Sequence, residues 1–270
     1  MSTVSSDDKK LIHDEVRDGV AWVTLTNPPA NAYSHAMMLE LDAAILRARF
    51  DERVHVIVLV GEGDKFFCAG ADIKWLGEIT ASYKYNFCLH ANETLLRLEQ
   101  TPKLVIAALN GHCVGGGLEI ALAADLRIAR LGAGKLGLPE VNLGVLPGTG
   151  GTQRLSRAVG KSKAIEMMVT GESLSFADAR ALGLVNKLVE GDGAEFRSQV
   201  QAWAKSFCPP GKAAMAVGRI KRAVQSGWEL PLESGLALER EMQQQLFSSD
   251  DAREGIAAFS ERRPPNFKGR

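Results

Sequence analysis

Residues 110–125 read NGHCVGGGLEIALAAD, and the most informative features of the chain lie in this stretch. Three consecutive glycines, 115–117, carry an entropic cost unless the backbone needs unusual dihedral angles or close approach to another group. Glu119 follows within an otherwise apolar segment, so a helix here has no polar face that would carry the side chain to water. Because an unpaired buried carboxylate is costly, we expect Glu119 either to have a structural partner or to serve as an acid or base. The local sequence leaves both alternatives open.

Working outward from this stretch, hydrophobic periodicity predicts a recurring order of strand, strand and helix. The expected strands and helices before residue 110 are a hairpin over 11–26 that turns at Asp18-Gly19, a helix capped by Ser34, a strand over 54–60, a helix over 81–99 and a strand over 104–109. Downstream, a short strand over 184–189 is followed by three helical segments between 196 and 261. The sequence therefore predicts an α/β core over residues 1–195 and a helical region over 196–270.

Residues 65–74, KFFCAGADIK, join an expected strand to an expected helix through the small residues 69–71. Main-chain N–H groups at such a turn, near a helix N-terminus, point outward together and can bind developing negative charge. An ordinary strand-to-helix connection is the alternative on spacing alone.

Residues 136–155, LGLPEVNLGVLPGTGGTQRL, form a loop rich in glycine and proline that is too long to be a simple connection. Glu140 has apolar neighbours, which suits a carboxylate in a partly dry pocket, although an exposed turn glutamate is the commoner case. Gln153 occupies the position where a dinucleotide-binding fingerprint needs its last glycine, and no glycine cluster ends in Gly-Lys-Ser/Thr. Nucleotide-binding folds are therefore disfavoured.

Composition argues against several classes of partner. Lys plus Arg (32) equals Asp plus Glu (32) in 270 residues, so no excess charge favours nucleic acid or a membrane surface. The longest apolar stretch, 113–124, is shorter than the ~20 residues of a membrane span. Four cysteines and five histidines show no metal-ligand spacing, so no metal site is expected. The polar segment 1–10 resembles neither a signal nor a transit peptide, which favours the cytoplasm.

Taken in order, the three segments resemble the signature motifs of the crotonase (enoyl-CoA hydratase/isomerase) family. The resemblance extends from Asp18-Gly19 to the closing residues 254–270, EGIAAFSERRPPNFKGR. It implies a crotonase-like spiral of ββα units and a helical C-terminal trimerisation region. It also implies a homo-oligomer, either a trimer or a hexamer that is a dimer of trimers.

The resemblance also implies roles for individual residues. The N–H groups of Ala71 and Gly116 match the oxyanion hole for the thioester carbonyl, and Glu119 and Glu140 match the two catalytic glutamates of family hydratases. Six residues match positions that contact coenzyme A: Lys65, Ala69, Asp72, Ile73, Lys74 and, at the phosphate end, Arg262. Coenzyme A is here part of the substrate, and no separate cofactor is expected.

The expected activity is that of an enoyl-CoA hydratase, which adds water to the double bond of a 2-enoyl-CoA thioester to give 3-hydroxyacyl-CoA. We assign Glu119 mainly to the water and Glu140 mainly to the α-proton, although a shared role is equally compatible with the sequence. One alternative is isomerisation or another acyl-CoA reaction on the same scaffold, but family isomerases often manage with one glutamate. The other is a non-catalytic RNA-binding or scaffold protein, which the balanced charge and the intact glutamates disfavour.

Overall fold

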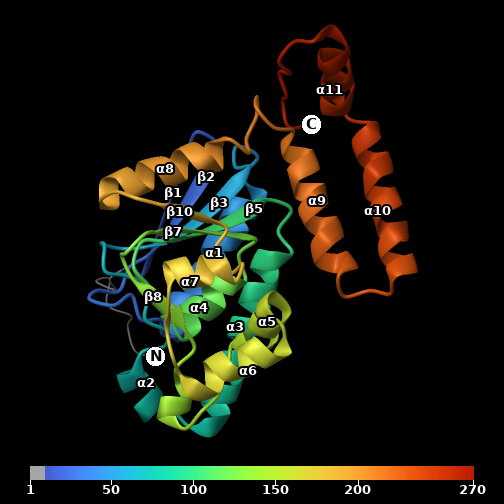
Figure 1. Ribbon diagram of the computed structural model, residues 1–270. Coiled ribbons are helices and arrows are strands. Elements are labelled where there is room, and N and C mark those ends of the chain that lie inside the picture. The colour runs from blue at the N-terminus through green and yellow to red at the C-terminus, as the bar shows by residue number, and fades with distance from the viewer. Residues whose placement is uncertain (1–9) are drawn as a thin grey trace, which may run out of the picture.

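The computed structural model describes residues 10–270, and its strands form two sheets (Figure 1). Residues 1–9, which contributed to the expected cytoplasmic location, lie outside the described part. The larger sheet has the order β1 (Ile12–Arg17), β2 (Val20–Leu25), β3 (Val56–Gly61), β5 (Leu104–Leu109), β7 (Leu126–Arg130) and β10 (Lys187–Val189). The smaller sheet has the order β4 (Phe66–Cys68), β6 (His112–Val114), β8 (Lys135–Gly137) and β9 (Leu174–Ser175).

The chain alternates between the two sheets, and helical segments follow each pair of strands. Strands β3, β5 and β7 lie in the larger sheet, and each is followed by a strand of the smaller sheet. The helical segments of this part are α1 (His35–Phe50), α2 (Ile73–Glu78), α3 (Ala81–Glu99), α4 (Gly116–Leu122), the 3-10 helix η1 (Glu140–Leu143), α5 (Gly151–Val159), α6 (Lys161–Thr170) and α7 (Phe176–Ala181). This arrangement confirms the predicted α/β fold of repeated ββα units.

Local sequence explains the elements that support the site. Asp18 and Gly19 both adopt positive φ, 50° and 81°, in the predicted hairpin turn between β1 and β2. Ser34 caps α1 and accepts a hydrogen bond from the Met37 N–H, as expected from its position. Strands β3 and β5 are buried along their whole length and pair in parallel, as is typical of strands covered on both faces.

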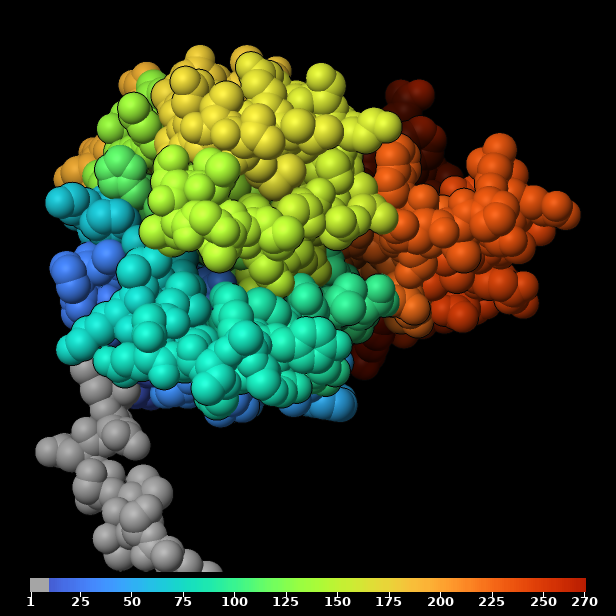
Figure 2. Space-filling model, turned by 90° about the horizontal axis from the view of Figure 1, so that it is seen from below, coloured from blue at the N-terminus to red at the C-terminus, as the bar shows by residue number. Residues whose placement is uncertain are grey.

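The C-terminal region differs from the expected organisation. It contains four helices rather than three segments: α8 (Gly193–Lys205), α9 (Ala214–Gly227), α10 (Leu232–Phe247) and α11 (Asp250–Glu261). The expected boundary at residue 195 falls inside α8, whose buried Phe196 and Val200 pack in one apolar cluster with β2 and β3. Helix α8 therefore packs with the sheet. Residues 214–270, which we call the C-terminal arm, project from the body in both views (Figures 1 and 2).

Helix hydropathy, possible metal ligands and cysteines can be described for the same part of the chain. Within residues 10–270, no helix is both long enough and apolar enough to cross a bilayer. In the same range, no group of three or more His, Cys, Asp or Glu side chains is placed to hold a metal ion. All four cysteines are free thiols.

Candidate active site

Two turns, one in each of two ββα units, lie against each other at the candidate site. The first turn connects β4 to α2 and contains Gly70, at φ 89°, while the second connects β6 to α4 and contains Gly115, at φ 56°. A Cβ atom on Gly70 would lie 3.1 Å from the backbone nitrogen of Gly116. The two turns therefore bring Ala71 and Gly116 close together.

Among residues 10–270, no acceptor binds the backbone N–H groups of Ala71 and Gly116. A parallel bridge joins residues 33 and 71, and its bonds run from the Tyr33 N–H to the Gly70 carbonyl (2.9 Å) and from the Asp72 N–H to the Tyr33 carbonyl (3.0 Å). These bonds leave the Ala71 N–H outside the bridge. Gly116 is the first residue of α4, so its N–H has no acceptor within the helix. Both groups can therefore serve as donors to a ligand.

Close packing explains the three consecutive glycines. A Cβ atom on Gly116 would collide with the Tyr33 hydroxyl, and one on Gly117 would collide with the Cys68 carbonyl. Gly115 has a backbone conformation that side chains rarely adopt. The glycines thus allow α4 to begin directly against β4 and Tyr33.

Glu119 lies in the first turn of α4 and is 2% exposed, as the sequence predicted. Its Oε1 accepts hydrogen bonds from the Thr149 N–H (2.8 Å) and the Gly151 N–H (2.7 Å), and its Oε2 contacts the Thr149 hydroxyl. Gly151 is the first residue of α5, so the carboxylate lies at the N-terminus of that helix. These donors hold the carboxylate in one orientation.

Glu140 is in a different environment. Its Oε1 would lie 3.2 Å from a Cβ atom on Gly115, and its Oε2 is buried without a hydrogen-bond partner within residues 10–270. Burial raises the pKa of Glu140 to about 7, and the negative charge of Glu119 adds to the rise, whereas its own N–H and Lys84 oppose it. Glu140 can therefore take up or release a proton near neutral pH.

The structure brings some of the predicted site residues together and leaves one apart. Ala71, Gly116, Glu119 and Glu140 surround the start of α4. Arg262 instead ends α11, which Figure 1 shows far from α2 and α4. Within a single chain, Arg262 does not reach this site.

The residues matched to coenzyme A follow β4 and α2. Lys65, Ile73 and Lys74 are exposed, and Ala69 is half-buried. The Asp72 side chain caps α2, accepting from the N–H groups of Lys74 (2.9 Å) and Trp75 (3.2 Å). Asp72 thus has a structural role in shaping the turn.

Sequence reasoning missed the partners of both carboxylates. Thr149 and Gly151 hold Glu119 from 30 and 32 residues away, and the sequence signal was a glycine-rich segment before a helix, whose free N–H groups attract anions. Tyr33, whose hydroxyl lies 3.4 Å from the Thr149 hydroxyl, had no signal in the sequence. Neither did Lys84, whose charge acts on Glu140.

This geometry combines two kinds of chemistry. Two backbone donors at one point can stabilise an oxyanion, which is often the largest single contribution to catalysis of reactions at a carbonyl. Two carboxylates with different environments can divide the roles of base and acid. The arrangement thus suits proton transfer coupled to charge development on a carbonyl oxygen.

Comparison with known proteins agrees with this geometry. Residues 15–270 match the family model described as enoyl-CoA hydratase/isomerase. A probable enoyl-CoA hydratase of Bacillus subtilis is 41% identical, with 93% of this chain and 95% of that protein covered. A short-chain-enoyl-CoA hydratase of Clostridium acetobutylicum is 38% identical, with the same two coverages of 93% and 95%. The crystal structure of an enoyl-CoA hydratase from Geobacillus kaustophilus matches with a TM-score of 0.93 and 44% identity, covering 97% of this chain and 98% of that one.

Proposed function

The chain belongs to the enoyl-CoA hydratase/isomerase family, and from this premise we propose that it hydrates 2-enoyl-CoA thioesters to 3-hydroxyacyl-CoA. The observation that carries the proposal is the pair of unlike carboxylates beside two free backbone donors. Glu119 is held by three donors, while Glu140 has a pKa of about 7 and a carboxylate oxygen without a partner in the described residues. The relatives named as hydratases support the same activity.

In this mechanism, the N–H groups of Ala71 and Gly116 bind the thioester oxygen. Conjugate addition of water pushes negative charge onto that oxygen and gives an enolate-like transition state. Fixed donors stabilise this charge without reorganisation, and the loss of one such donor costs about 3–4 kcal/mol in a comparable site. The pairing of Tyr33 with the turn at Ala71 holds one of the two donors in place.

The two glutamates divide the proton transfers. Glu119, whose carboxylate is held in place by the N–H groups of Thr149 and Gly151, acts mainly as the base on the attacking water. Glu140, which is protonated in much of the population near neutral pH, mainly delivers the proton to the α-carbon. Glu119 then holds the proton that it took from water, and transfer of this proton to Glu140 completes the cycle.

Substrate binding uses the segment from β4 to α2. Lys65 and Lys74 are exposed cations suited to the phosphates of coenzyme A, and the exposed Ile73 offers an apolar contact. Ala69 lies in the turn between β4 and α2. The reaction requires no cofactor beyond coenzyme A, which is part of the substrate.

The C-terminal arm supports assembly into trimers or a dimer of trimers. Its helices expose large apolar side chains: Ile220, Val224, Trp228, Leu232, Phe247 and Phe259. Apolar surface of this extent favours a protein partner. In such an assembly, Arg262 would reach coenzyme A only from a neighbouring copy. The four free thiols are compatible with the reducing cytoplasm that we propose as its location.

A direct test of the activity follows the loss of the conjugated double bond of crotonyl-CoA. Hydration lowers its ultraviolet absorbance, and chromatography identifies 3-hydroxybutyryl-CoA as the product. The same assay with a 3-enoyl-CoA detects isomerisation. No hydration of any 2-enoyl-CoA in a chain-length panel by the folded protein would refute the proposal.

A further inference from the structure

The position of Glu119 depends on a loop that α4 does not contain. In the described part of the chain, its three hydrogen-bond donors belong to Thr149 and Gly151, so a shift of this loop would change the direction of the carboxylate. We propose that the ion pair between Glu99 and Arg154 positions Glu119 for catalysis by fixing this loop. The proposal rests on the hydratase function above.

The ion pair is well formed and shielded from water. Arg154 donates from Nε and Nη2 to the two carboxylate oxygens of Glu99, each at 2.8 Å. The side chains are only 13% and 15% exposed, so the interaction is screened less than a surface pair. A planar guanidinium in a bidentate pair is held in orientation as well as in distance. Glu99 thus fixes Arg154 relative to α3.

Arg154 in turn contacts the loop directly. Its Nη1 donates to the Thr149 carbonyl at 3.2 Å, and its own N–H donates to the Gly150 carbonyl at 2.8 Å. The guanidinium lies against Gly150, at φ 114°, where a Cβ atom would collide with Nη1. Thr149 is therefore held by Arg154 through its carbonyl and holds Glu119 through its N–H and hydroxyl. Thr149 thus links the ion pair to the Glu119 carboxylate.

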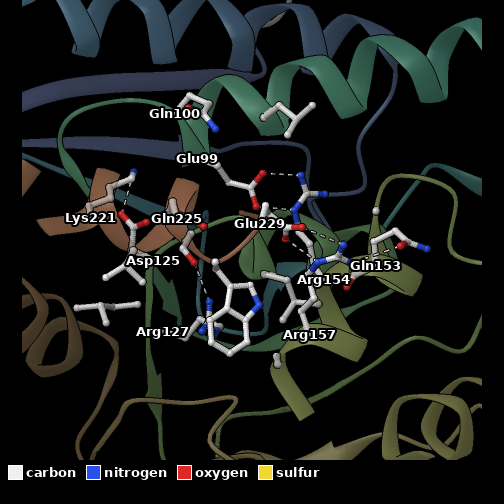
Figure 3. A pocket seen from close by; sticks show the side chains of 18 of the residues that line it. Glu99, Gln100, Asp125, Arg127, Gln153, Arg154, Arg157, Lys221, Gln225 and Glu229 are labelled. Atoms are coloured by element: carbon white, nitrogen blue, oxygen red, sulfur yellow. Dashed lines mark hydrogen bonds and ion pairs between the residues drawn. The ribbon is translucent and has the colours of Figure 1, made fainter. Parts of the chain in front are cut away.

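Part of the loop borders a cavity. The loop residues 146–148 and 150 form part of the wall of a cavity of about 1190 Å³ between the body and α9. Figure 3 shows Glu99 and Arg154 in this wall, with Lys221 and Asp125 on the other side of the cavity. Thr149 itself is 2% exposed and does not line the cavity, so the ion pair adds a directional restraint on its carbonyl to the packing that already surrounds it.

A second ion pair at the same cavity provides a matched control. Arg157, on α5, pairs with Glu229 at 2.8 Å, and both side chains are about half exposed. Arg157 bonds to Gln153 and Glu229 but not to Thr149 or Gly150 within the described residues. Arg157 therefore lies on the same helix as Arg154 and also forms an Arg–Glu ion pair, but it lacks the contact with Thr149 and Gly150.

The test compares the double variant Glu99→Gln/Arg154→Met with Glu229→Gln/Arg157→Met. Removing both charges leaves no buried unpaired ion, so the first variant should fold with a Tm within a few degrees of the parent. For crotonyl-CoA hydration, we expect its kcat to fall about 10- to 100-fold with KM changed less than threefold, as for small misplacements of a catalytic group. The control should keep kcat within twofold.

The outcomes separate this inference from the proposed function. A parent protein without hydratase activity would refute the function itself. A parent that hydrates crotonyl-CoA, with a folded Glu99→Gln/Arg154→Met variant of unchanged kcat, would refute only the positioning role. If the double variant does not fold, Arg154→Lys decides, since it keeps the charge and loses the bidentate geometry. A fall in kcat at unchanged Tm supports the role, and an unchanged kcat overturns it.

Discussion

Replacing Glu140 by Gln should abolish most hydration and, at the same time, stabilise the protein at alkaline pH. The amide keeps the shape of the side chain but cannot carry the proton, and general acid–base catalysis contributes about 10²–10⁴-fold. We therefore expect a loss of kcat in this range, with binding of a saturated acyl-CoA nearly unchanged. The activity and the stability of one variant thus move in opposite directions.

The stability effect follows from the pKa of Glu140, which is raised from 4.5 to about 7 in the folded chain. Below pH 4.5 the carboxyl group is protonated in both the folded and the unfolded states, so it has no effect on stability. As the pH rises towards 7, the unfolded chain ionises first, and the folded state loses relative stability. Above pH 7 the loss is complete, at about 1–2 kcal/mol once the partial exposure of the group is taken into account.

The assay is thermal unfolding of the parent and Glu140→Gln at pH 4 and pH 8, beside crotonyl-CoA hydration across the same range. At pH 8 the variant should have the higher Tm, by roughly 2–6 °C for a chain of this size. At pH 4 the two proteins should melt together. The parent's kcat/KM should fall as the pH rises above about 7, because the protonated form of Glu140 is the proton donor. An equal Tm difference at both pH values, or hydration within a few-fold of the parent, would refute this reasoning.

Three further predictions concern the backbone donors and the assembly. Gly116→Ala should lower kcat about 100-fold, because the new methyl group collides with the Tyr33 hydroxyl and displaces a donor, whereas Gly77→Ala, with open space around it, should have little effect. An amide-to-ester substitution at Ala71 should lower kcat about 10²–10³-fold while leaving the affinity for butyryl-CoA nearly unchanged; equal weakening of both would mean that the donor only holds the thioester. Light scattering should give a mass that is a multiple of three chains, and a stable monomer at micromolar concentration would contradict the proposed assembly.

Much of the fold was predictable because its determinants are local. The Asp18-Gly19 turn, the Ser34 cap and the buried strands each depend on a few adjacent residues. The C-terminal region was less predictable. The sequence of α8 indicates a helix but not the sheet that covers its Phe196 and Val200, so the boundary was placed inside it.

In the candidate site, too, local features were predictable from the sequence and long-range contacts were not. The burial of Glu119 could be predicted from its apolar neighbours, since burial along a short helix is a local property. For its donors the sequence offered a glycine-rich segment before a helix, but not the fact that this segment reaches Glu119, because that contact depends on the packing of α5 against α4. The raised pKa of Glu140 likewise depends on burial by distant segments and on the charge of Glu119.

Steady-state hydration of crotonyl-CoA by Glu119→Gln tests the central claim most directly. Glutamine preserves the size of a side chain that is 2% exposed, but it cannot deprotonate the attacking water. The account predicts that kcat falls by about 10²–10⁴-fold while the dissociation constant of butyryl-CoA stays within a few-fold of the parent value. Hydration within a few-fold of the parent by a folded Glu119→Gln variant would contradict it.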